Sequence, residues 1–152
     1  MIQFCAHVAP RRPTRPAVEV LKLFDAAIFY LIIGNADAHG KNYSLLYGPD
    51  GATLAPLYDL VSTVAYPELS LKLSMKIAKC ATLEEIDEST WPKFAADVGL
   101  AAPFVRKRVR ELSSAVADSA SGVAAQIAMP GLSEAYLTRI AAFVAGRAAG
   151  LR

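Results

Sequence analysis

Apolar residues recur at helical spacing in the first long stretch of the chain, which runs from Ala17 to Ile33. The pattern predicts a helix with one buried face, at about 3.6 residues per turn. The residues on that face are Val18, Leu21, Phe24, Ile28, Leu31 and Ile32. Gly34-Asn35 follows at once and predicts the end of the helix, because glycine readily adopts the left-handed conformation found at many helix ends.

The next stretch combines extended runs with turn residues. Residues 43–47 (YSLLY) and 52–55 (ATLA) are short β-type runs, and residues 48–51 (GPDG) between them are typical of a turn. This arrangement predicts a small β-hairpin. Apolar and polar residues then alternate over residues 69–77, which predicts a third extended segment.

The remainder of the chain is predicted to be helical. Residues 82–85 (TLEE) fit a capping box, a side-chain pattern that begins many helices. Trp91 and Phe94 share one face of a short helix, and Gly99 is placed to end it.

A long apolar repeat begins after Pro103, a residue favoured in the first turn of a helix. It predicts one long amphipathic helix, or two with a bend near residues 121–122. The apolar positions of the repeat are Val105, Val109, Leu112, Val116, Val123 and Ile127. Residues 129–131 (MPG) break the pattern, and Ser133 is a suitable cap for a last helix.

These elements predict a mainly α fold with a small β-hairpin. The length of 152 residues favours one domain, which we place at residues 17–152. Residues 1–16 are predicted to be an irregular N-terminal segment, because Pro10, Pro13 and Pro16 interrupt any helix. An apolar content of 54% indicates a folded, globular chain.

The charge and the cysteine content of the chain bear on its expected partners and cellular compartment. The net charge of +2 is close to neutral, and the basic residues near 106–110 lie on a helix with an apolar opposite face. We therefore expect a solvated face and no direct nucleic-acid partner. Cys5 and Cys80 are far apart, as suits a reducing cytoplasm. The apolar run at residues 26–33 is too short for a bilayer, which needs about 20 apolar residues, so we expect a cytoplasmic protein without membrane contact.

Candidate chemistry lies in the stretch GNADAHGKN, residues 34–42. Asp37 and Asn42 occupy a loop after the first predicted helix, and Asp59 follows the predicted hairpin. Because a loop–hairpin–loop path returns to one end of the hairpin, these three side chains are expected to converge. Two carboxylates and an amide oxygen suit Mg²⁺, which binds oxygen ligands and substrate phosphates.

The same residues also have interpretations without chemistry. Asp37 would then be a solvated turn carboxylate, and Asp59 the side chain of an Asx turn. His39 would be structural, and Lys41 a solvated loop charge. The spacing alone leaves these alternatives open.

The interval from Asp37 to Asn42 equals that between the catalytic Asp and the metal-binding Asn of protein kinases, in the pattern H-R-D-x-x-x-x-N. The flanking residues differ, since Asn35-Ala36 replaces His-Arg. His39 stands two residues after Asp37, where eukaryotic kinases often carry a lysine.

The stretches GNADAHGKNYSLLY and LAPLYDLVSTVAYP resemble the C-terminal domain of HipA-like serine/threonine kinases, the toxins of bacterial toxin–antitoxin systems. The family signature is D-x-H-x-K-N followed by Y-D-x-x-S. Both elements occur in this sequence in that order and at a similar distance from each other. The resemblance implies a helical kinase C-lobe with Asp37 as catalytic base and Asn42 and Asp59 as Mg²⁺ ligands. It makes His39 and Lys41 active-site neighbours, and it implies ATP and Mg²⁺ as cofactors.

The resemblance also implies partners. Family members phosphorylate protein hydroxyls, with an aminoacyl-tRNA synthetase a known type of target, and a helix-turn-helix antitoxin restrains them. The sequence departs from the family in having no G-x-G-x-x-G phosphate loop and only a short segment before Ala17. We therefore expect a C-terminal fragment without the ATP-clamping N-lobe and with little activity alone. The alternative is an inactive remnant that binds the antitoxin or the missing lobe, or that self-associates.

Overall fold

The computed structural model describes residues 16–151, apart from residues 50, 128–130 and 132. Residues 1–15 of the predicted irregular segment 1–16 therefore lie outside the described residues. The same is true of residues 129 and 130 in the predicted break at 129–131. The elements in chain order are α2 (Pro16–Ile32), η1 (Gly40–Asn42), β1 (Leu45–Gly48), β2 (Gly51–Leu54), η2 (Thr63–Ala65), β3 (Lys72–Ile77), β4 (Cys80–Thr82), α3 (Thr90–Val98), α4 (Ala102–Gln126) and α5 (Glu134–Gly150).

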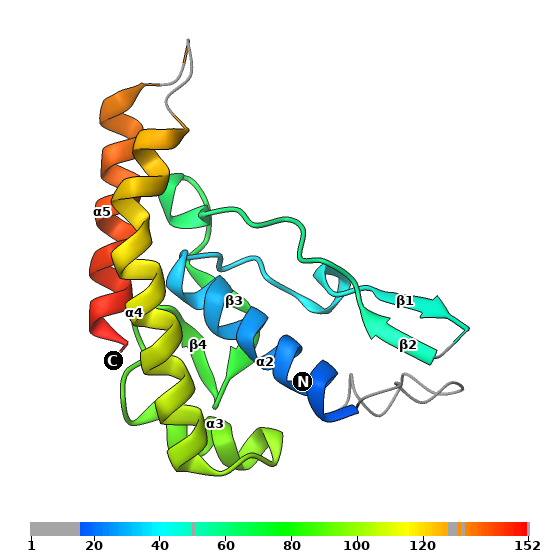
Figure 1. Ribbon diagram of the computed structural model, residues 1–152. Coiled ribbons are helices and arrows are strands. Elements are labelled where there is room, and N and C mark those ends of the chain that lie inside the picture. Colours follow the sequence, from blue (N-terminus) through cyan, green and yellow to red (C-terminus); the bar gives the residue numbers. More distant parts are fainter. Residues whose placement is uncertain (1–15, 50, 128–130, 132, 152) are drawn as a thin grey trace.

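The described residues are mainly helical, with two small antiparallel hairpins, which confirms the predicted fold class. Helices α4 and α5 run side by side, α2 crosses near their lower half, and the β1–β2 hairpin projects away from the helices (Figure 1). In the described part of the chain, no helix combines the length and the apolar character that crossing a lipid bilayer would require.

Helix α2 supplies the centre of the core, as its apolar repeat predicts. Phe24, Ile28 and Ile32 are at most 2% exposed. Phe24 stacks on Phe94 of α3 with ring centroids 5.7 Å apart, so the predicted face of α3 is also buried. The first apolar position of the repeat, Val18, is exposed, because it lies at the outer end of the helix.

Helix α4 is a single helix without a break at residues 121–122, which decides between the two predicted alternatives. Its apolar face is buried only in the first half. Val105 and Val109 are fully buried, whereas Val123 and Ile127 are 47% and 45% exposed. The reason is geometric, since the far ends of α4 and α5 extend beyond α2 (Figure 1).

The predicted capping box at residues 82–85 is wrong. Thr82 is the last residue of β4 and pairs with Lys72, and residues 83–85 form a bend and a turn. The Glu85 carboxylate instead accepts a hydrogen bond from the Ala81 backbone N–H at 2.6 Å. The next helix, α3, begins only at Thr90, whose Oγ1 accepts from the Asp87 N–H at 3.1 Å.

The extended segment predicted at residues 69–77 is confirmed as β3, but its partner β4 was not predicted. The two strands are joined at Ala78-Lys79, where both residues have positive φ angles of 49° and 73°. Such a two-residue turn usually carries Asn-Gly or a similar pair, so the sequence gives no hairpin signal here.

The β1–β2 hairpin is tied to α2 by Glu19. Its carboxylate accepts from the Leu54 backbone N–H at 2.6 Å and from Lys22 Nζ at 2.9 Å. The hairpin leads from Asn42 to Asp59, so this contact fixes the path between two candidate site residues.

Two arginines, Arg108 and Arg147, join α2 to the helices α4 and α5. Arg108 of α4 forms a paired contact with the Asp25 carboxylate of α2, with nitrogen–oxygen distances of 2.8 and 2.7 Å. Arg147 of α5 donates to the backbone oxygens of Leu31 and Leu83 at 3.0 and 2.6 Å. Arg108 thus holds the middle of α2, and Arg147 holds its end, where the candidate site begins.

We expect Gly34→Ala to destabilise the fold more than Gly99→Ala. Both glycines have φ near +70°, and this conformation costs an alanine roughly 1–2 kcal/mol. At Gly34 an added Cβ would also lie 2.6 Å from Val64 Cγ2 and 2.8 Å from Phe143 Cε1, whereas at Gly99 it would meet nothing within 4 Å. Such overpacking typically costs a further 1–3 kcal/mol or so. Urea unfolding of both variants measures the difference, and equal losses would contradict the close packing at Gly34.

We expect Glu19→Gln to lower the free energy of unfolding by roughly 1 kcal/mol at pH 7, since a charged hydrogen-bond acceptor is lost. Hydrogen bonding to Leu54 lowers the pKa of the Glu19 carboxyl. Its stabilising effect is therefore complete above the unfolded-state pKa and disappears as the pH falls through the folded-state value. Urea unfolding should show a difference from the wild type at pH 7 that shrinks by pH 3. The exposed Glu88→Gln is the control, and a difference independent of pH would count against the contact.

Candidate functional site

The site begins where α2 ends. Gly34 adopts φ of +72°, its N–H donates to Leu31 O at 3.3 Å, and the Asn35 N–H donates to Tyr30 O at 2.9 Å. This pattern is a Schellman motif, in which a left-handed glycine lets the last carbonyls of a helix find donors. The predicted helix end at Gly34-Asn35 is confirmed.

Asn35 joins this helix end to the candidate residue Asp59. The Asn35 side chain is only 3% exposed. Its Oδ1 accepts from the Asp37 N–H at 3.1 Å, and its Nδ2 donates to the Asp59 backbone oxygen at 2.9 Å. One buried amide thus fixes the backbone positions of both candidate carboxylates.

Thr63 of η2 makes a second connection between the same two segments. Its Oγ1 donates to Gly34 O at 3.0 Å and accepts from the Ala36 N–H at 2.9 Å. The sequence analysis did not single out Thr63, and an isolated threonine in an irregular segment gives no signal that could have revealed it.

Asp37 lies on the exposed side of the loop. Its Oδ1 accepts from the Ser74 hydroxyl of β3 at 2.9 Å, and the Ser74 N–H donates to Ala36 O at 2.9 Å. Strand β3 therefore supports the Asp37 carboxylate and its backbone together. The only sequence signal for Ser74 was its place among the polar positions that alternate along residues 69–77.

Asn42 and Asp59 are brought together, as the loop–hairpin–loop path predicts. The Asn42 Nδ2 donates a hydrogen bond to Asp59 Oδ2. Asn42 is 3% exposed, and its Oδ1 is buried without a hydrogen-bond partner among the described residues. Asp59 has a φ of 58°, a left-handed conformation that is uncommon for residues other than glycine, asparagine and aspartate.

The segment before Asp59 is fixed by tyrosines. Tyr30 of α2 donates its hydroxyl to Tyr58 O at 2.9 Å, and the Tyr58 hydroxyl donates to Lys41 O at 2.6 Å. Burial, and next the negative charge of Asp59, raise the pKa of Tyr30. Tyr30 therefore remains a neutral donor at physiological pH.

His39 and Lys41 lie in the same loop but are not joined to the other candidates. His39 is half-buried, and its Nδ1 has no hydrogen-bond partner in the described part of the chain. The Lys41 side chain is exposed. Within the described ranges, no hydrogen bond or ion pair links either side chain to Asp37, Asn42 or Asp59.

The donor set at Asn42 and Asp59 suits a hard cation. The Asp59 carboxylate contacts the Asn42 amide through Nδ2. The Oδ1 of the same amide is buried and has no hydrogen-bond partner among the described residues. Among the described residues, no group of three or more His, Cys, Asp or Glu side chains could enclose a metal ion. Mg²⁺ commonly binds one or two protein carboxylates and keeps several ligands from water or substrate phosphates.

The chain is similar in sequence to known proteins. A family model described as the HipA-like C-terminal domain matches residues 1–120. The chain is 47% identical over 144 residues to a protein named putative kinase Y4mE from Sinorhizobium fredii, covering 95% of this chain and 34% of that protein. It is also 51% identical over 51 residues to the serine/threonine-protein kinase toxin HipA of Shewanella oneidensis, which covers 34% of this chain and 12% of the toxin.

The fold matches a solved structure as well. The HipA chain of Shewanella oneidensis MR-1, determined in a toxin–antitoxin complex with HipB and operator DNA, matches with a TM-score of 0.84 and 25% identity. The match covers 91% of this chain and 33% of the HipA chain, so the chain spans about a third of the length of that protein and of the putative kinase. With the sequence signature, the family model and the fold in agreement, this chain belongs to the HipA-like C-terminal domain family.

Proposed function

We propose that this chain carries the catalytic loop and the metal-binding residues of an ATP-dependent serine/threonine protein kinase. The observation that carries the proposal is the contact between Asn42 and Asp59, with the Asn42 Oδ1 buried and unpartnered beside it. Asp37 precedes Asn42 by the interval that the kinase catalytic loop requires. The named kinase relatives support the proposal.

In this proposal Asp37 accepts the proton of the attacking hydroxyl. It is exposed, so a protein substrate can reach it, and Ser74 orients it by donating to Oδ1. The other oxygen of the carboxylate then remains available to the substrate hydroxyl. General bases of this kind act within hydrogen-bonding distance of the proton that they accept.

Asn42 and Asp59 would hold Mg²⁺ through the amide Oδ1 and the carboxylate. When bound, the ion would neutralise negative charge on the phosphates of ATP. His39 and Lys41 flank Asp37 in sequence, and we assign them to the same site as neighbours of the transferring phosphate. His39 is half-buried, and its buried Nδ1 makes no hydrogen bond within the described residues, so no other contact occupies this nitrogen.

The rest of the ATP site would come from an N-terminal lobe. The chain spans about a third of its full-length relatives, and we assign residues 17–152 to the catalytic-loop domain. The substrate would be a protein hydroxyl in the cytoplasm. A helix-turn-helix antitoxin is the proposed partner, and the toxin–antitoxin complex of the Shewanella oneidensis relative supports it.

A second candidate function is a protein-binding role without catalysis. It is favoured by a run of large apolar side chains that follow Asp59 and are 39–46% exposed. The run contains Leu60, Val61, Tyr66, Leu69 and Leu71. Such a surface suits docking of a missing lobe, an antitoxin or a second copy of the chain.

We expect Asp37→Asn to lower phosphate transfer by roughly 10²–10⁴-fold, the usual contribution of a general base. The assay follows transfer of labelled phosphate from ATP to a protein substrate, with an N-terminal kinase lobe supplied. Asp97→Asn, an exposed change on α3, is the matched control and should leave the rate unchanged. Undiminished transfer in Asp37→Asn would refute Asp37 as the base, and absence of transfer from the unmodified chain would favour the protein-binding role.

We expect Asp59→Asn to raise the Mg²⁺ concentration needed for half-saturation by about tenfold or more, because a charged ligand is lost. Binding of Mn²⁺ as a paramagnetic substitute, followed by water proton relaxation, measures this directly on the chain. Asp87→Asn, at an exposed turn, serves as the control. Equal metal affinity in Asp59→Asn and the unmodified chain would show that the ion binds elsewhere.

A further inference from the structure

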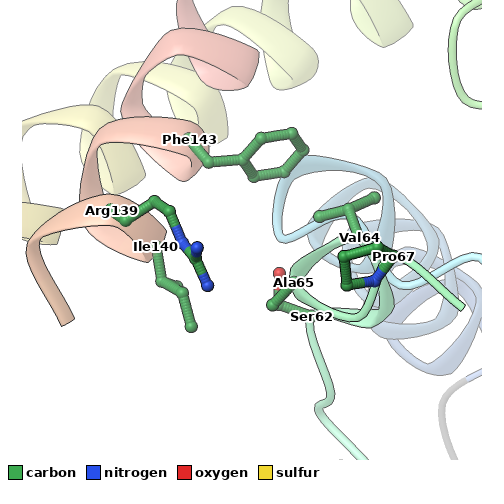
Figure 2. A pocket seen from close by; sticks show the side chains of 7 residues that line it. All are labelled: Ser62, Val64, Ala65, Pro67, Arg139, Ile140 and Phe143. Atoms are coloured by element: carbon green, nitrogen blue, oxygen red, sulfur yellow. The ribbon is translucent and has the colours of Figure 1, made fainter. Parts of the chain in front are cut away.

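A pocket with a cavity volume of about 210 Å³ lies between residues 62–67 and helix α5. Figure 2 shows it in close view. Its walls are mostly apolar, and two polar residues are also part of its lining. The residues that matter here are Val64, Pro67, Ile140 and Phe143 on the apolar side, with Ser62 and Arg139.

The two polar residues face the same space. The Arg139 side chain extends from α5 toward residues 62–65 (Figure 2). Its guanidinium lies 5.4 Å from the centre of the Tyr136 ring, and it forms no ion pair with any described carboxylate. The Ser62 Oγ is buried and has no hydrogen-bond partner among the described residues. Among the described residues, the Arg139 guanidinium thus has no carboxylate partner, and the Ser62 hydroxyl has no hydrogen-bond partner.

The pocket adjoins the catalytic loop. Val64 and Phe143 close over Gly34, where an added Cβ would lie 2.6 and 2.8 Å from their side chains. The Val64 N–H also donates to Gly34 O at 3.3 Å, and Gly34 lies three residues before Asp37.

We propose that this pocket binds an acidic side chain of the protein substrate, with its carboxylate between Arg139 and Ser62 and a neighbouring apolar side chain against Phe143. This inference rests on the proposed kinase function and names the substrate class. The planar guanidinium is suited to a carboxylate, because it donates two parallel hydrogen bonds. The apolar walls favour a polypeptide segment over a free inorganic ion.

The test uses two acetylated and amidated peptides, each with one Ser and one Leu. Their sequences differ at a single position, which is Glu in one peptide and Gln in the other. Titration into the isotope-labelled chain is followed by NMR at the Arg139 Nε–H and the Val64 and Ala65 amides. We expect the Glu peptide to shift these signals and to bind roughly 5–10-fold more tightly than the Gln peptide, a modest effect because Arg139 is exposed.

Arg139→Gln should remove this preference for Glu, whereas Arg106→Gln, an exposed change on α4, should keep it. Equal binding of both peptides to the unmodified chain, or an unchanged preference in Arg139→Gln, would overturn the proposal. Asp37→Asn separates the two proposals, since it should lower phosphate transfer by roughly 10²–10⁴-fold and leave the peptide preference intact. Phosphate transfer without a Glu preference would refute the pocket alone, and a Glu preference without transfer would refute the kinase function alone.

Discussion

The buried side chains of Asn35 and Thr63 are the constraint on which the candidate site depends. The end of α2 leaves backbone groups that need partners, and these two residues supply partners while holding the segment around residues 59–63. A buried hydrogen bond contributes only about 1 kcal/mol net, but an unpaired buried group costs about 1–3 kcal/mol. Separating the two segments would leave several such groups unpaired at once. The helix end and the candidate metal-binding segment are therefore expected to stay together as one unit.

The β1–β2 hairpin lies between Asn42 and Asp59 in the chain and brings these two residues together. Its register pairs Leu45 with Leu54, and just outside it the Ala55 N–H donates to Ser44 O at 2.9 Å. Glu19 and Tyr30 then hold the returning strand and the segment before Asp59 to α2. Since both anchors belong to the helix that forms the core, the separation between Asn42 and Asp59 is set by the core rather than by the exposed hairpin.

Periodic and repeated features of this fold could be predicted from the sequence, whereas single contacts could not. Helical repeats predicted α2, α3 and α4, and the interval between Asp37 and Asn42 indicated the candidate site. Thr82 fitted a helix cap by pattern, but pairing with Lys72 places it in a strand, because tertiary contacts override a local preference. Ser74 and Thr63 support the candidate loop through one or two hydrogen bonds each, and such contacts leave no periodic pattern in a sequence.

Two local irregularities lie next to each other at the candidate site. Asp59 is held in a left-handed conformation, and the buried Asn42 Oδ1 beside it has no partner among the described residues. Each costs free energy that the surrounding packing must offset, and such costs gather at functional sites. A purely structural Asx turn would explain the conformation of Asp59 but not the unpaired oxygen of Asn42. A cation bound by the Asn42 Oδ1 and the Asp59 carboxylate would give that oxygen a partner. The buried oxygen therefore supports the proposed magnesium site beyond what the spacing alone supports.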